Sequence, residues 1–159
     1  MRPRLTRGPG PFLVLGLGLV AIAASSARSI PPARSSAPRV ESYVIERADS
    51  LNGRIAAATR AGERWTHDPV RVALEVSGES PQFARSLDLR YEGNGGERPD
   101  SAVVTLLADG YADDSVRGTW LRLRLARQGD DAWRVVEVRR AWRCWRGHHR
   151  ESYSKQPCL

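Results

Sequence analysis

The sequence predicts an α+β domain in which an N-terminal helix, or two, packs on a curved antiparallel sheet of about five strands. Apolar residues recur with a helical period between residues 40 and 58, and after residue 69 they alternate with polar residues in short segments separated by turns. The 159 residues suit one domain. With 41% hydrophobic and 27% charged residues, the composition excludes a disordered tail, a collagen-like repeat and a multi-span membrane protein.

The first 39 residues predict an export signal and a linker. Three arginines and no acidic residue precede a 13-residue apolar run at residues 12–24, which is too short for the roughly 20 residues that cross a bilayer core. We expect a signal peptide at 1–27 cleaved after Ala27, a Pro/Ser-rich linker at 28–39 and a single domain at 40–159. Cleavage after Ala23 and a retained N-terminal anchor are the alternatives. The cleaved protein would be periplasmic or secreted, with no stable membrane span.

Residues 40–58 predict a helix because their apolar positions are three or four residues apart, which places them on one helical face. These positions are Val40, Val44, Ala48, Leu51, Ile55 and Ala58. Gly62 then indicates the end of the helix. Asn52 and Gly53 interrupt the stretch and leave open whether one helix or two shorter helices form.

Five segments predict strands, at residues 70–76, 87–91, 102–107, 121–125 and 133–144. The third is apolar throughout, so we expect it to be central in the sheet. In the last, the apolar side switches between Val135 and Val136, as at a β-bulge. Turns are expected at residues 93–100, at Asp109-Gly110 and at residues 129–131.

This order of elements resembles the NTF2-like fold, in which a curved sheet wraps a helix and often leaves a pocket. The resemblance implies a site for a small molecule between helix and sheet, with or without catalysis. The candidate lining residues of such a pocket are Tyr43, Tyr91, Trp120 and Trp133.

Cys144 and Cys158 are the two cysteines, and behind an export signal two thiols usually pair. Their bond would close the tail onto the end of the last strand. Together with His148 and His149 they also supply zinc-ligand types. However, adjacent histidines seldom both reach one ion, and the usual short Cys pair is missing. We therefore expect a disulfide, no metal and no cofactor.

The formal net charge is +7, and the basic residues concentrate toward the C-terminus. Residues 117–159 carry 11 basic and 4 acidic residues, whereas residues 28–116 carry 11 and 14. A basic third of a domain is the electrostatic footprint expected for an anionic partner. The candidate anion-binding residues are Arg122, Arg124, Arg143, Arg146, His148 and Arg150.

Aromatic and cationic residues interleave between Trp142 and Arg150, a pattern that suits single-stranded nucleic acid, sugars or anionic lipids. The export signal argues against nucleic acid. In the alternative interpretation, Trp142 and Trp145 pack on the disulfide while the arginines are solvated.

The C-terminal segment resembles a group of small exported bacterial proteins of unknown function. The resemblance lies in WRVVEV from Trp133, in WRCWRGH at residues 142–148 and in Cys158, with DDSV at residues 113–116 as a further part. A single Arg-Gly precedes the doubled His here, where the resemblance leads us to expect a longer Gly-Arg-rich turn. It implies no substrate and no catalytic residue.

No catalytic motif is visible: the HExxH motif, the P-loop and the dinucleotide fingerprint are absent from the sequence. His67, Asp68 and Ser115 lack the local geometry of a triad. Asp109, Asp113 and Asp114 crowd one segment at spacings that could bind calcium, but solvated turn residues are the simpler interpretation.

We expect a non-enzymatic exported domain that contacts an anionic envelope partner through its basic C-terminal third. An NTF2-like pocket protein is the alternative, and a purely structural accessory domain is the third hypothesis.

Overall fold

The computed structural model describes residues 37–78, 83–129 and 131–159. The predicted export signal and residues 28–36 of the predicted linker lie outside this part of the chain. Across those three described ranges, no helix has the length and apolar character that a membrane crossing requires.

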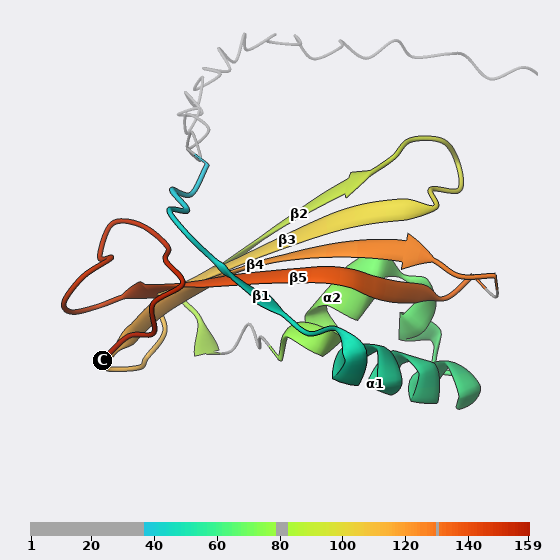
Figure 1. The fold of residues 1–159 in the computed structure, drawn as a ribbon, viewed down its shortest axis with the longest axis horizontal. Coiled ribbons are helices and arrows are strands. Elements are labelled where there is room, and N and C mark those ends of the chain that lie inside the picture. Colours follow the sequence, from blue (N-terminus) through green and yellow to red (C-terminus); the bar gives the residue numbers. More distant parts are fainter. Residues whose placement is uncertain (1–36, 79–82, 130) are drawn as a thin grey trace, which may run out of the picture. The chain divides into compact units, whose positions relative to one another are not determined.

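Five antiparallel strands form one sheet in the order β1-β5-β4-β3-β2 (Figure 1). The strands are β1 (Val44–Glu46), β2 (Ser86–Gly93), β3 (Ser101–Asp109), β4 (Val116–Arg127) and β5 (Trp133–Cys144). Strands β2 to β5 follow one another as a meander, with β3 in the interior of the sheet as predicted, and the short β1 pairs with β5 at the other edge. The molecule thus has the predicted α+β class and a curved open sheet of five strands.

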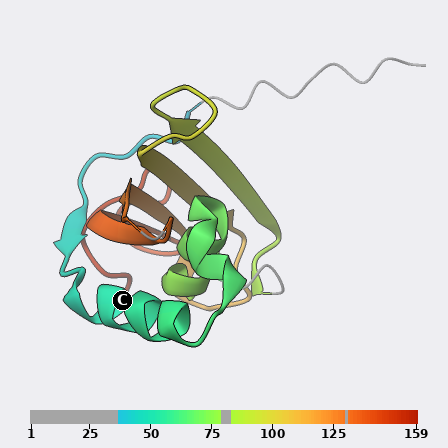
Figure 2. The ribbon, with the colours of Figure 1, turned by 90° about the vertical axis from the view of Figure 1, so that its right-hand side faces the viewer.

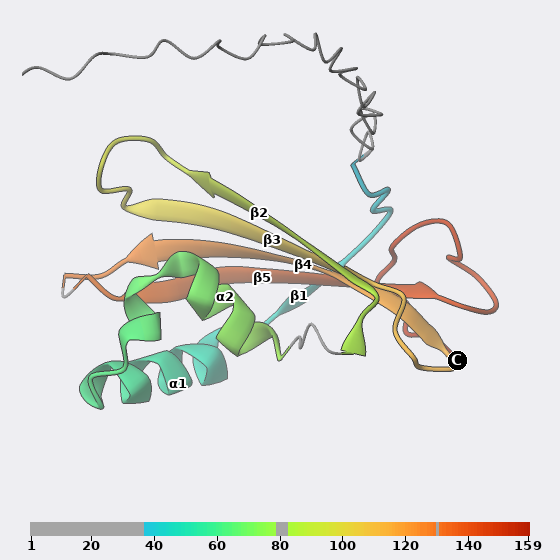
Figure 3. The same cartoon turned by 180° about the vertical axis from the view of Figure 1, so that it is seen from behind.

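Two helices, α1 (Asp49–Arg60) and α2 (Pro69–Ser77), lie on the same face of this sheet, joined through the short 3-10 helix η1 (Arg64–His67) (Figures 2 and 3). Ile55 from α1 and Val72 and Val76 from α2 are buried in the core between the two layers. The sheet contributes the buried residues Ala102, Val104, Leu106, Leu121, Leu123, Leu125, Trp133, Val135 and Val138. Burial of these apolar surfaces holds the helices on the sheet.

The first helix begins at Asp49, so the prediction of a helix from Val40 was wrong for its first part. Val40 forms an isolated β-bridge with Tyr153, and Val44 lies in β1. Their apolar side chains therefore match the helical spacing while belonging to extended chain. The predicted end is confirmed: Gly62 has φ +74, and its N–H donates to the carbonyl of Thr59 at 3.0 Å.

Residues 70–76 form helix α2, so the prediction of a strand there was wrong. Their alternation hides a helical face, because Val72, Ala73 and Val76 are the buried residues. The residues at the start of this segment favour a helix over a strand. The Asp68 carboxylate accepts hydrogen bonds from the N–H groups of Val70 and Arg71, and proline occupies the first turn.

The predicted bulge in β5 is confirmed, and a side chain from α1 occupies it. Arg124 pairs with Glu137 and Leu125 with Val135, which leaves Val136 unpaired and exposed. The Asn52 side chain donates to the Val135 carbonyl at 2.9 Å and accepts from the Val135 N–H at 2.8 Å. Helix α1 continues through Asn52 and Gly53 without a break. The residue that suggested an interruption instead ties the helix to the sheet.

Replacing Asn52 with leucine should lower the free energy of unfolding by about 1–3 kcal/mol, although leucine is the better helix former. The cost arises because two backbone groups of Val135 lose their partner in a partly buried position. Urea unfolding of Asn52→Leu measures the change, with Gln128→Leu as the control, because Gln128 is exposed beyond the end of β4 and its side chain makes no hydrogen bond among the described residues. Equal losses in the two variants would show that the bulge contact contributes nothing specific.

Candidate functional site

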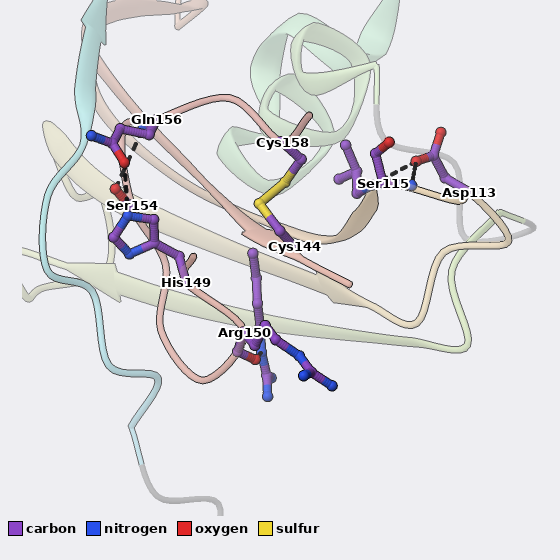
Figure 4. Close-up of a disulfide and its surroundings, with 10 residues drawn as sticks. Asp113, Ser115, Cys144, His149, Arg150, Ser154, Gln156 and Cys158 are labelled. Carbon is purple, nitrogen blue, oxygen red and sulfur yellow. Dashed lines mark hydrogen bonds between the residues drawn. A yellow bond between two sulfur atoms is a disulfide. The ribbon is translucent and has the colours of Figure 1, made fainter. Parts of the chain in front are cut away.

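Cys144 and Cys158 form a disulfide, as predicted (Figure 4). Their Cα atoms are 5.5 Å apart, and the residues are separated by 14 positions. Cys144 is buried at the end of β5, so the bond ties the tail to one end of the sheet. The alternative zinc site loses both thiolates to this bond. Among the described residues, no group of three or more His, Cys, Asp or Glu side chains is arranged to hold a metal ion.

The tail between the two cysteines folds back and pairs with backbone on both of its sides. Trp142 and Ser154 exchange two backbone hydrogen bonds of 2.8 and 2.9 Å. On the other side, the Tyr153 N–H donates to the Arg39 carbonyl, and the Glu41 N–H donates to the Tyr153 carbonyl. Residues 152–154 thus lie between the end of β5 and residues 39–41, and their side chains are buried.

The loop at residues 145–151 is fixed by contacts at His149. One ring nitrogen of His149 lies 2.9 Å from the amide oxygen of Gln156, and the other lies 3.5 Å from the Glu41 carboxylate (Figure 4). The His149 carbonyl also accepts a hydrogen bond from the Cys144 N–H. Gly147 turns the chain with φ +71. These contacts give the loop a defined shape beyond the end of β5.

Asp109 joins the end of β3 to two arginines close to this loop. Its carboxylate lies 3.3 Å from Arg117 Nε and 3.4 Å from Arg143 Nη1. The Arg143 Nε also donates to the Arg150 carbonyl at 2.9 Å. Burial, with the charge of Asp109 as a second cause, raises the pKa of the Tyr153 phenol, although a hydrogen bond from Arg143 opposes the shift. Arg143, predicted to bind an anion, is therefore engaged inside the protein.

The six predicted anion-binding residues fall into separate groups. Arg122 and Arg124 lie on β4 and face away from the helices, because Leu121, Leu123 and Leu125 occupy the helix side. Three others lie in the loop at residues 145–151, namely Arg146, His148 and Arg150. Arg143 lies beneath this loop. The structure therefore does not bring the six together in one patch.

The cationic loop, which we define as Trp145, Arg146, His148 and Arg150, is exposed to solvent. Within the described part of the chain, no carboxylate pairs with Arg146, His148 or Arg150. The Trp145 ring is 37% exposed, with the Arg117 guanidinium 5.0 Å from its centroid, and its indole N–H donates to the Tyr111 carbonyl at 3.3 Å. Trp145 therefore sits at the surface in a fixed orientation among cations.

The four aromatic residues proposed for an NTF2-like pocket do not line one cavity. Trp133 lies in the core on the helix side, whereas Trp120 lies on the opposite face with its ring centroid 6.2 Å from that of Tyr43. Tyr91 is exposed on the edge strand β2. Trp133 and the leucines of β4 fill the space between the helices and the sheet.

The residues considered for a calcium site or a catalytic triad make separate contacts and do not form one site. Asp113 accepts hydrogen bonds from the N–H groups of Ser115 and Val116, which lower the pKa of its carboxyl group (Figure 4). Asp109 pairs with arginines, and Asp68 caps α2. His67 lies on η1, far along the chain from Ser115, and no hydrogen bond joins the two in the described structure.

No protein-family model, curated protein or solved structure matches this chain.

The network of Asp109, Arg117 and Tyr153 was not predicted from the sequence. Tyr153 is distant in the chain from Asp109 and Arg117, and none of the three belongs to a recognisable motif. The cysteine pair was the available signal, because it indicated that the tail returns to the end of the last strand.

Proposed function

We propose that this chain is an exported, non-enzymatic domain whose cationic loop contacts an anionic partner at the cell envelope. The observation that carries the proposal is the absence of carboxylate partners for Arg146, His148 and Arg150 among the described residues. Several other arginines of the sheet are paired with acids, namely Arg117, Arg127, Arg139, Arg140 and Arg143. The side chains of Arg146, His148 and Arg150 are thus available to a partner.

The fixed shape of the loop supports this proposal. The disulfide, the backbone pairing of Trp142 with Ser154 and the contacts of His149 hold the loop in one conformation. A loop that is already ordered loses little conformational entropy when it binds. Guanidinium groups can bind phosphate or carboxylate in a bidentate manner, and the exposed Trp145 ring adds a surface for stacking or apolar contact.

Export is supported by two independent features. The apolar run at residues 12–24 follows three arginines, in the order of a signal peptide. The disulfide is a bond that persists in oxidising compartments such as the periplasm or the extracellular space. The resemblance to small exported bacterial proteins agrees with the same compartment. The anionic partner is therefore sought in the envelope, as a lipid headgroup or a polysaccharide.

The double substitution Arg146→Gln/Arg150→Gln should weaken binding to vesicles containing phosphatidylglycerol, or to heparin, by about tenfold at low ionic strength. Added salt should weaken binding of the wild-type protein more steeply than that of the variant, because the wild type makes more ionic contacts. Cosedimentation with vesicles and elution from a heparin column measure the two effects.

The matched control is Arg60→Gln/Arg134→Gln, which removes the same charge at the other end of the sheet. Arg60 ends α1 and Arg134 lies near the start of β5, away from the cationic loop (Figure 1). The control should bind almost as well as wild type. If the two variants weaken binding equally, net charge and not the loop is responsible. If the wild type binds neither probe, the proposal is wrong.

A further inference from the structure

A groove of about 210 Å³ crosses β2, β3 and β4 on the face of the sheet opposite the helices. Leu107 and Trp120 line it, together with Val40 from the segment that precedes β1. Trp120 is 7% exposed, and its indole N–H has no hydrogen-bond partner among the described residues. An apolar surface with unused polar groups is the usual composition of a small-molecule site.

The pairing register arranges the groove side chains in rows across the sheet. Arg90, Thr105 and Arg122 form one row. The next row, formed by Asp88, Leu107 and Trp120, supplies the apolar part. Glu92 lies on the other side of the Arg90 row, away from Trp120. The groove therefore offers an apolar region at one end, donors in the middle and a carboxylate at the other end.

The charges in the groove indicate which ligand it suits. Asp88 and Arg90 form an ion pair at 3.6 Å and largely compensate each other. Arg122 and Glu92 have opposite charges, and neither forms an ion pair within the described ranges. A simple anion would pair with Arg122. The Glu92 carboxylate would then have no partner and would lie close to the negative charge of the ligand. A ligand that carries both charges satisfies both residues.

We propose that this groove binds a small zwitterion with an apolar side chain, of the chemical class of free α-amino acids. The ligand carboxylate binds Arg122 and the Thr105 hydroxyl, the ammonium group faces Glu92, and the apolar side chain covers Leu107 and Trp120. The volume lies below the roughly 300–1,000 Å³ of pockets for larger organic ligands, which agrees with a small molecule. The site is separate from the cationic loop and does not depend on its function.

The indole N–H of Trp120 provides a direct probe of this site in the disulfide-bonded protein. The chain has five tryptophans, and the Trp120 resonance in a ¹H–¹⁵N spectrum is the one missing from Trp120→Phe. L-leucine should move this resonance, with an affinity at least about tenfold higher than that of either analogue lacking one charge. The analogues are leucinamide, which has no carboxylate, and 4-methylpentanoate, which has no ammonium group. L-valine and L-phenylalanine test the size of the apolar side chain.

Two substitutions separate the two charges, and a third serves as the control. Arg122→Gln should weaken leucine binding about tenfold and remove its advantage over leucinamide, whereas Glu92→Gln should remove its advantage over 4-methylpentanoate. Arg124→Gln is the matched control, because Arg124 lies two residues along the same face of β4 and outside the groove. It should bind leucine like wild type. Unchanged amide spectra elsewhere confirm that each variant is folded.

Three results would overturn the proposal. One is a Trp120 resonance that none of the three amino acids moves. Another is equal binding of leucine and its two analogues, which would remove the requirement for both charges. The last is an equal loss in Arg124→Gln and Arg122→Gln, which would place the effect in the general charge of the sheet face.

Discussion

Replacing Trp133 with alanine should lower the free energy of unfolding by about 3–5 kcal/mol. The ring is 1% exposed in the core between the helices and the sheet, and its indole N–H donates to the His67 carbonyl at 3.3 Å. The Arg127 guanidinium lies 4.8 Å from the ring centroid. The substitution leaves a large cavity and removes the partner of the His67 carbonyl. Urea unfolding followed by circular dichroism measures the loss.

Trp145→Ala is the matched control for this prediction, because it removes the same side chain from the surface. The Trp145 ring is 37% exposed, so its loss should cost about 1 kcal/mol or less. Trp133→Phe keeps most of the ring and should cost less than Trp133→Ala, which provides a measurable variant if the alanine protein does not fold. Similar losses in Trp133→Ala and Trp145→Ala would contradict the position of Trp133 in the core.

Opening the disulfide should lower the free energy of unfolding by about 3 kcal/mol. The bond closes a loop of about 15 residues, and in the chain-entropy model such a closure restricts the unfolded state by this amount. The double variant Cys144→Ala/Cys158→Ser tests the prediction in urea, with the oxidised wild-type protein as the reference. A loss below about 1 kcal/mol would show that the hydrogen bonds of the tail hold it without the bond.

The reduced wild-type protein separates two sources of the loss. Cys144 is buried, so its replacement by alanine also removes a sulfur atom from a packed position. Reduction opens the same loop while both sulfur atoms remain. If loop closure is the cause, reduced wild type and double variant lose the same free energy. A much smaller loss on reduction would assign the effect to packing at Cys144.

Several features could be predicted because local chemistry and final structure agree. The change of the apolar side at Val135 and Val136 indicated a bulge, since side chains alternate strictly between the faces of a strand. Gly62 indicated a helix end because glycine adopts positive φ without strain. The two cysteines indicated a bond because the sequence predicts an export signal, and two thiols usually pair in an oxidising compartment.

Two elements could not be predicted, because their apolar residues fit the period of a helix as well as that of a strand. Val70, Val72, Leu74 and Val76 alternate like a strand, and the Asp68-Pro69 start overrides that pattern by capping a helix. Val40 and Val44 continue a helical spacing but lie on extended chain beside the tail and β5.

The candidate site was only partly predictable. The loop arginines were recognised from composition, but composition cannot show which arginines the fold pairs with acids. Asp109 pairs with Arg143 and leaves Arg146 and Arg150 exposed, a distinction that depends on the return of the tail. The groove beside Trp120 depends on the register of three strands and on residues 37–40, which no local pattern relates to one another.

Residues 152–154 lie between β5 and residues 39–41. The N-terminal segment of the domain therefore cannot complete its pairing until the C-terminal tail has been synthesised. The Ser42 and Ser154 hydroxyl groups are 3.2 Å apart although 112 positions separate these residues. During synthesis, residues 39–41 emerge well before residues 152–154, and until these pair with them their backbone is exposed to solvent and proteases. Their protection begins when Ser154 arrives, and Cys158 then locks the arrangement covalently. Protease resistance around residue 40 therefore reports that the tail has paired with residues 39–41.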